Sequence, residues 1–222
     1  QGVSYPNPSL FYFLATDIWL TASDSDETLA TGWVGHFLDQ EYPGYPTGYP
    51  NSTDPDPLAL QIGNVVSTAL QGPSVNMGIA ITSSTSFYQL TSGTYDPAPN
   101  TPAGHELTFI RETSLQTQQY ATVIKNAALA QANLSTLYPT AGTNPLADQL
   151  KIVAQLIGGG LQTRVYMVNL NGFDTHNSQV DTGGTHLGEH ADLLSKLSEA
   201  ITAFEDDVTL MGQQDRVIGM TF

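Results

Sequence analysis

The sequence contains no cysteine and very few basic residues. The absence of cysteine excludes a disulfide framework, a thiolate nucleophile and a cysteine-ligated zinc site. Six lysine and arginine residues stand against 21 aspartate and glutamate residues, and the formal net charge is −15. Basic side chains supply most of the affinity of proteins for nucleic acids and for anionic membranes, so the sequence predicts neither as a partner.

Long apolar runs are also missing. No segment approaches the roughly 18 consecutive apolar residues that cross a bilayer, so we expect no membrane span. Charged residues make up only 12% of the chain, which leaves much of the surface to serine, threonine, asparagine, glutamine and glycine. The scarcity of lysine and the abundance of serine and threonine favour an exported protein, in the periplasm, at the cell surface or outside the cell.

A predicted strand followed by acidic and histidine residues organises the second half of the chain. Hydrophobic residues make up 40% of the 222 residues, enough for the core of a single α/β domain over 1–222. Residues 163–170 predict a buried strand that ends at an Asn-Gly turn signal. Asp174 and His176 follow this turn, and His190 begins a long amphipathic pattern. Ligands of open α/β sheets bind beyond the carboxyl ends of parallel strands, so these three side chains are expected to face one cleft.

The rest of the chain alternates apolar segments and turn signals. Residues 10–20 are almost wholly apolar and predict a buried helix or strand, between which periodicity does not decide. The tyrosines of 42–57 predict an ordered loop packed on the domain. The other predicted elements are a helix at 33–38, a helix at 58–70, a strand at 75–81, a long helix within 107–137, a helix at 145–157, a helix from His190 to Gly212 and a strand at 216–222. The last elements, with the strand at 163–170, form a predicted βαβ unit with a leading helix.

The helix that begins at His190 has the most regular pattern in the chain. Its apolar stripe alternates by four and three residues through His190, Leu194, Leu197, Ile201, Phe204 and Val208. This spacing places His190 at the head of the buried face. It also predicts that Leu197, Ile201 and Phe204 pack against the strand at 163–170.

The predicted sheet is incomplete. The sequence starts without a first strand and stops inside the predicted strand at 216–222. An isolated βαβ unit is a poor sheet. We therefore expect the remainder of a longer polypeptide, or another subunit, to complete it.

The block Gly172-Phe173-Asp174-Thr175-His176 is the most specific motif in the chain. It is accompanied by Gln179, His190-Ala191-Asp192-Leu193-Leu194, Leu197-Ser198-Glu199-Ala200, Asp215-Arg216-Val217, Tyr5-Pro6-Asn7-Pro8, Asp17-Ile18-Trp19, Thr31-Gly32-Trp33-Val34-Gly35 and Leu58-Ala59-Leu60-Gln61-Ile62-Gly63. Together these motifs span nearly the whole chain, and they resemble the DUF1501 family. That family comprises exported bacterial proteins of uncharacterised activity, grouped with the alkaline-phosphatase-like and sulfatase-like hydrolases.

The resemblance implies an alkaline-phosphatase-like fold, a three-layer α/β/α sandwich around a mainly parallel sheet. It also implies metal-assisted hydrolysis of a phosphate or sulfate ester. Family members usually carry an earlier Gly-Gly-x-Asp-Gly-like segment and a later Ser-Glu-Phe-Gly-Arg-Arg segment with an Asp-His pair, which resemble further metal half-sites. This sequence contains neither. Where relatives carry a Ser-His-Phe-Arg-like stretch, it has the apolar Phe11-Tyr12-Phe13-Leu14.

Asp174, His176 and His190 are the candidate metal ligands. A carboxylate with imidazoles suits Zn or Mn, and a carboxylate alone suits Mg or Ca. In the alternative interpretation, Asp174 caps the turn, His176 is a surface residue and His190 belongs to the core or caps its helix. The protein would then be a non-catalytic extracellular binding or structural protein on the same scaffold. His186 is expected to face solvent.

Overall fold

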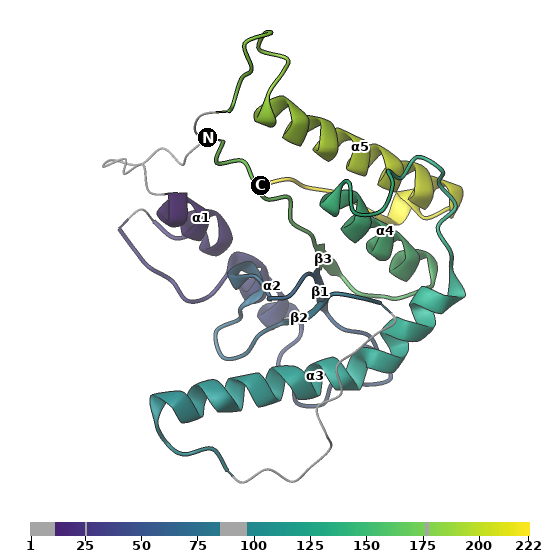
Figure 1. The fold of residues 1–222 in the computed structure, drawn as a ribbon. Coiled ribbons are helices and arrows are strands. Elements are labelled where there is room, and N and C mark those ends of the chain that lie inside the picture. Colours follow the sequence, from purple (N-terminus) through teal and green to yellow (C-terminus); the bar gives the residue numbers. More distant parts are fainter. Residues whose placement is uncertain (1–11, 25, 85–96, 176–177) are drawn as a thin grey trace.

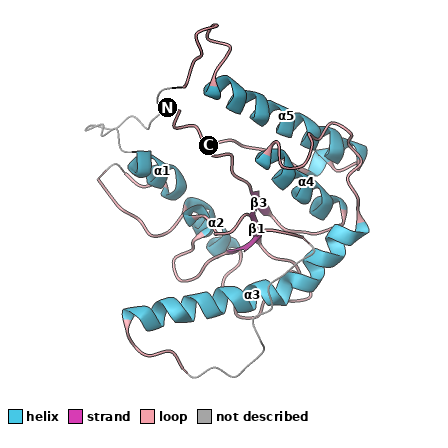
Figure 2. Ribbon diagram, in the orientation of Figure 1, coloured by secondary structure: helices cyan, strands magenta, loops and turns pink. Residues whose placement is uncertain are grey.

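The chain folds into helices around a small parallel sheet (Figure 1). The computed structural model describes residues 12–24, 26–84, 97–175 and 178–222. The elements are α1 (Tyr12–Thr21), α2 (Trp33–Glu41), β1 (Ala59–Ile62), the 3-10 helix η1 (Thr68–Leu70), β2 (Gly78–Ile81), α3 (Pro102–Ala130), α4 (Pro145–Gly158), β3 (Val165–Met167), α5 (Glu189–Leu210) and the 3-10 helix η2 (Gln214–Arg216). The class is mixed α/β, as predicted, with the short strands between the helices (Figure 2). Within the described ranges, no helix has both the length and the apolar character that crossing a membrane requires.

The sheet has the order β2-β1-β3, and both pairings are parallel. The central strand β1 is buried at every residue, and it lies inside the segment 58–70 for which the sequence predicted a helix. That prediction is wrong. A short, mostly apolar segment fits a strand with partners on both edges as well as it fits a helix, and Gly63 ends this segment at strand length.

Alternate residues of the strands pack in two separate clusters. Leu60 and Ile62 lie in a cluster with side chains of α3 and α4. Ala59 and Met167 lie in a second cluster with side chains of α2 and η1. Because successive strand residues point to opposite faces, helices lie against both faces of the sheet (Figure 1). The loop at 42–57 is ordered, as predicted, and buries Tyr45 in the second cluster.

The strand predicted at 163–170 is shorter than expected, because β3 covers only Val165–Met167. Beyond β3 the backbone turns to α4. There the Asn169 N–H donates to Gln149 Oε1 (3.0 Å), and Gln149 Nε2 donates to the Asn169 carbonyl (2.8 Å). These two hydrogen bonds satisfy backbone groups that a longer strand would have paired in the sheet.

Residues 216–222 do not form the predicted strand, so the predicted βαβ unit lacks its closing strand. Residues 214–216 form η2, and 217–222 make no ladder. Ile218 is 98% exposed, while Phe222 makes an edge contact with Trp33 of α2, with ring centroids 6.1 Å apart. A strand needs backbone partners, and the outer edge of the three-residue β3 offers few of them.

The predicted helices are largely confirmed. The alternatives for 10–20 are resolved in favour of a helix, α1. The helix at 33–38 is α2, and the helix at 145–157 is α4. α4 starts where its signals predicted, because Asn144 Oδ1 accepts a hydrogen bond from the Ala147 N–H (3.2 Å) and Pro145 is the first helical residue.

The long helix predicted within 107–137 is α3, with shifted ends. It begins earlier than predicted, at Pro102, where Thr101 Oγ1 accepts a hydrogen bond from the Gly104 N–H (3.1 Å). It ends at Ala130, and two of the following backbone N–H groups bind the carboxylate of Asp207 on α5. The end of α3 is therefore set by a contact that is distant in sequence.

α5 confirms the last predicted helix and much of its predicted buried face. Val208 is buried, and Leu197 and Phe204 pack in clusters that include residues of the segment 163–170, as predicted.

The start of the stripe differs from the prediction. Leu194 is 47% exposed, whereas Leu193 is buried. The buried face thus begins at Leu193, and His190 is only partly buried. Two adjacent leucines fit the helical period almost equally well, so the period alone does not choose between them.

Phe204→Ala is expected to lower the free energy of unfolding by about 2–3 kcal/mol, because the side chain is partly buried against the cluster that contains Leu60. Leu194→Ala, a truncation on the exposed face of the same helix, should cost less than about 1 kcal/mol. Urea unfolding followed by circular dichroism measures both. An equal cost for the two variants would contradict the observed face of α5.

Candidate functional site

The predicted site begins in the segment that leaves the carboxyl end of β3. Gly172 has φ +104, a backbone conformation that favours glycine. An added Cβ there would lie 3.5 Å from Leu193 of α5, so the segment passes close to the first turns of that helix. The next residue, Phe173, meets the ring of His190 edge-on, with ring centroids 6.1 Å apart. The segment that carries Asp174 and the start of α5 therefore meet, and the shared cleft of Asp174, His176 and His190 stays a prediction.

The loop between this segment and α5 folds back onto the start of the helix. The N–H groups of Glu189 and His190 donate to the carbonyls of Ser178 (2.9 Å) and Gln179 (3.4 Å). Gly188 has φ +113, and an added Cβ would lie 2.9 Å from the Gln179 carbonyl oxygen. These contacts fix the first turn of α5 against the loop and engage the backbone donors that an anion would otherwise use at a helix start.

The structure describes two of the three predicted ligands, Asp174 and His190. Asp174 is exposed and makes a polar interaction, and its neighbour Thr175 is buried. His190 is partly buried beside Phe173. His176 lies outside the described residues.

Metal coordination at this corner stays a prediction. Among the residues that the structure describes, no three His, Asp or Glu side chains are grouped so that they could hold an ion. The predicted set includes His176, which is outside those residues. His186 is exposed, as expected.

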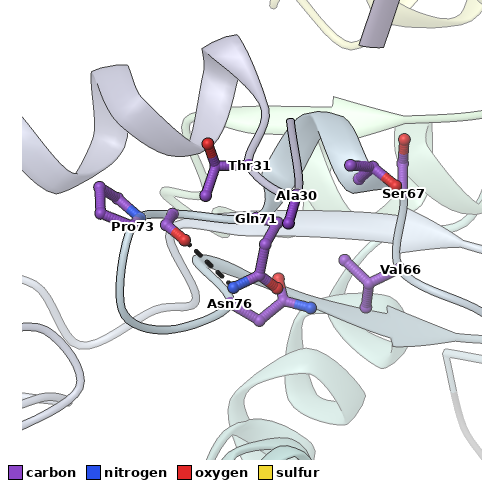
Figure 3. A pocket seen from close by; sticks show the side chains of 9 residues that line it. Ala30, Thr31, Val66, Ser67, Gln71, Pro73 and Asn76 are labelled. Carbon is purple, nitrogen blue, oxygen red and sulfur yellow. Dashed lines mark hydrogen bonds between the residues drawn. The ribbon is translucent and has the colours of Figure 1, made fainter. Parts of the chain in front are cut away.

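A second polar surface is a hollow of about 370 Å³ between the start of α2 and residues 66–76 (Figure 3). The backbones come very close here, since the Gly32 N–H donates to the Gln71 carbonyl (2.8 Å) and a Cβ on Gly35 would lie 2.6 Å from the Gly72 nitrogen. Only glycine allows this approach. The hollow is lined by Ala30, Thr31, Val66, Ser67, Thr68, Gln71, Gly72, Pro73 and Asn76.

Two side-chain amides lie together at this hollow. Gln71 and Asn76 face each other across an isolated antiparallel bridge, and Figure 3 shows their amides close to one another. Gln71 Nε2 donates to the Gly72 carbonyl (3.1 Å), and Asn76 Oδ1 accepts from the Gly78 N–H (3.1 Å). These bonds leave Gln71 Oε1 and Asn76 Nδ2 as the groups available to a ligand.

The sequence assigned no role to this region. Its polar residues are scattered between positions 30 and 76 without a motif spacing, and His36 belonged to no motif. In the structure, His36 Nε2 forms a hydrogen bond with Thr31 Oγ1 (2.9 Å), next to the hollow. The local signal in the sequence is Gly72-Pro73, which predicts a break in the backbone and indicates no chemistry.

Comparison with known proteins yields no match, whether with family models, curated proteins or solved structures. The resemblance to the DUF1501 family thus stays a prediction that depends on the sequence motifs.

Proposed function

We propose that this protein is an exported, metal-dependent hydrolase of phosphate or sulfate esters, built on an alkaline-phosphatase-like α/β/α sandwich. The observation that supports the proposal is the contact between Phe173 and His190. It joins the segment carrying Asp174 to the start of α5 beyond the carboxyl end of a parallel strand, where α/β proteins bind ligands.

The donor chemistry of the corner fits a divalent cation. Asp174 would supply a carboxylate oxygen, and His176 and His190 would supply imidazole nitrogens, a set suited to Zn or Mn. When bound, such an ion polarises the ester oxygen and lowers the pKa of the attacking group. Asp174 is an exposed residue and makes a polar interaction.

The charge of the protein favours chemistry that uses a bound cation. An anionic ester approaches a chain with a formal net charge of −15, which repels it at long range. Asp174 and the histidines would hold the cation at the point where the ester binds. The ring of Phe173 meets the imidazole of His190 edge-on, with ring centroids 6.1 Å apart.

Asp174→Asn and His190→Gln are each expected to reduce metal affinity by about 100-fold, because each removes one ligand of the set. Titration calorimetry with Mn²⁺ and Zn²⁺ measures the affinity, and release of nitrophenol from p-nitrophenyl phosphate and p-nitrophenyl sulfate measures turnover. Asp181→Asn and His186→Gln are the matched controls, since both residues are exposed on the same loop. They should leave affinity and turnover unchanged.

Equal metal affinity in the site variants and the controls would overturn the proposed ligand set. Metal binding without turnover of either ester would overturn the hydrolase and favour the non-catalytic binding protein. The two readouts therefore separate the metal site from the reaction.

A further inference from the structure

We infer that the hollow between the start of α2 and residues 66–76 binds a neutral polyhydroxylated ligand, such as one sugar unit. This inference is separate from the ester hydrolase, because none of the residues that line the hollow belongs to the predicted metal corner.

The lining offers both donors and acceptors of hydrogen bonds. Asn76 is 8% exposed, and with Oδ1 bonded to the Gly78 N–H its Nδ2 is left to donate. Ser67 Oγ accepts from the Ala69 N–H (3.2 Å), so its hydroxyl hydrogen is also left to donate. Gln71 Oε1 supplies an acceptor. Sugar hydroxyls both donate and accept, so they complement such a mixed set.

The charge around the hollow favours a neutral ligand over an anion. The lining contains no acidic, basic or histidine side chain. The chain as a whole carries a formal net charge of −15. The net negative charge would repel an anion, and no basic side chain in the lining would offset this repulsion. A neutral polyol would not be repelled.

The hollow is formed in advance by backbone contacts. The Gly72 N–H donates to the Val75 carbonyl (2.9 Å), and the Met77 N–H donates to the Leu70 carbonyl (3.0 Å), which closes the turn that carries both amides. Val66 and Pro73 add apolar walls. A volume of about 370 Å³ lies within the range of about 300–1,000 Å³ that small-molecule sites occupy. Preformed sites lose less ordering entropy on binding.

The test is a titration of the isotope-labelled protein with D-glucose, D-galactose, N-acetylglucosamine and myo-inositol, followed by ¹H–¹⁵N NMR. At least one of these probes should shift the backbone amides of Thr31 and Ser67 and the side-chain amide of Asn76. The shifts should saturate with a Kd on the order of 1 mM, as expected for a few hydrogen bonds in an open site. Sodium sulfate is the anionic probe and should leave these signals unmoved.

Two variants make the assignment specific. Ala30→Trp places a large ring from an exposed position into the hollow and should weaken binding by about tenfold or more. Thr68→Val removes one hydroxyl at nearly constant shape and should weaken it less. Ala141→Trp, an exposed alanine in another loop, is the control for the added ring. Circular dichroism checks that each variant is folded.

Three results would overturn the inference: no shift with any of the four probes, shifts that persist unchanged in Ala30→Trp, or shifts with sulfate alone. None of them bears on Asp174 or His190, so the hydrolase proposal would stand or fall separately.

Discussion

Asp207→Ala is expected to lower the free energy of unfolding by about 4 kcal/mol, one of the largest effects of any single truncation in this chain. Asp207 is completely buried near the end of α5. Its carboxylate accepts hydrogen bonds from Asn133 Nδ2 (2.6 Å), the Leu134 N–H (2.6 Å) and the Ser135 N–H (3.0 Å). The truncation would remove the acceptor of the Leu134 and Ser135 N–H groups and of one of the two Nδ2 hydrogens of Asn133.

The cost is large because these bonds join elements that are far apart in sequence. The segment after α3 is held to α5 by Asp207, and Asn133 also donates to the Lys151 carbonyl of α4 (3.0 Å). Burial first, and then the charges of Asp207 and Asp206, raise the pKa of Tyr138. One carboxylate therefore organises the junction of three helices.

The neighbouring acid is the matched control. Asp206 is partly buried and accepts from Ser135 Oγ (2.5 Å), so Asp206→Ala should cost about 1 kcal/mol. Asp207→Asn keeps the shape but leaves a single acceptor oxygen, and its cost should fall between the two. Urea unfolding of the three variants gives the order. An Asp207→Ala cost equal to that of Asp206→Ala would show that the buried network contributes little.

The network at Asp207 also marks a limit of sequence reasoning. An aspartate on the last turns of an amphipathic helix is ordinarily a solvated residue, and nothing nearby in sequence reveals its burial. The residues that it binds, Asn133-Leu134-Ser135, match the pattern of an N-glycosylation acceptor. In this structure the amide of Asn133 is engaged by Asp207 and the Lys151 carbonyl.

Local signals predicted the parts of the fold that depend on local physics. The Asn144-Pro145 start of α4 was predictable because its cap and its first residue act within one turn. The strand β1 was not, since β2 and β3 pair with its edges and helices distant in sequence cover its two faces. The apolar residues of 216–222 predicted a strand, but whether they pair depends on the edge that β3 presents.

One of the two candidate sites could be predicted from local signals, and the other could not. The sequence predicted that the segment of Asp174 and the start of α5 lie close together, because a strand, a turn and a helix start follow one another there. The contact of Phe173 with His190 agrees with this proximity. The hollow near Asn76 could not be predicted, because Gln71 and Asn76 acquire a shared role only when the backbone brings them opposite each other.

Gly159→Ala is the second substitution for which we expect a large effect, a loss of about 3 kcal/mol in the free energy of unfolding. The three glycines at 158–160 look alike in sequence, where they predict only the end of α4. In the structure their surroundings differ. An added Cβ on Gly159 would lie 2.6 Å from the carbonyl carbon of Ala127 and closer still to its oxygen, so α3 and α4 would have to move apart.

The adjacent glycines provide the comparison. Gly160 has φ +89 and open space around it, so Gly160→Ala should cost only about 1 kcal/mol, the strain of a left-handed alanine. At Gly158, the Cβ would meet the side chains of Met211 and Gln131, which are flexible at their ends, so Gly158→Ala should fall between the other two.

The backbone angles of Gly159 separate the cost of backbone strain from the cost of helix packing. Gly159 has φ −76 and ψ 1, which alanine adopts without strain, so any large cost of Gly159→Ala must come from the collision with Ala127. Thermal and urea unfolding of the three variants measure the order 159, 158, 160 in decreasing cost. If Gly160→Ala proved the most destabilising of the three, the left-handed backbone at the end of α4 would contribute more to stability than the packing of α3 against α4. The close approach of the two helices would then not be the reason for glycine at position 159.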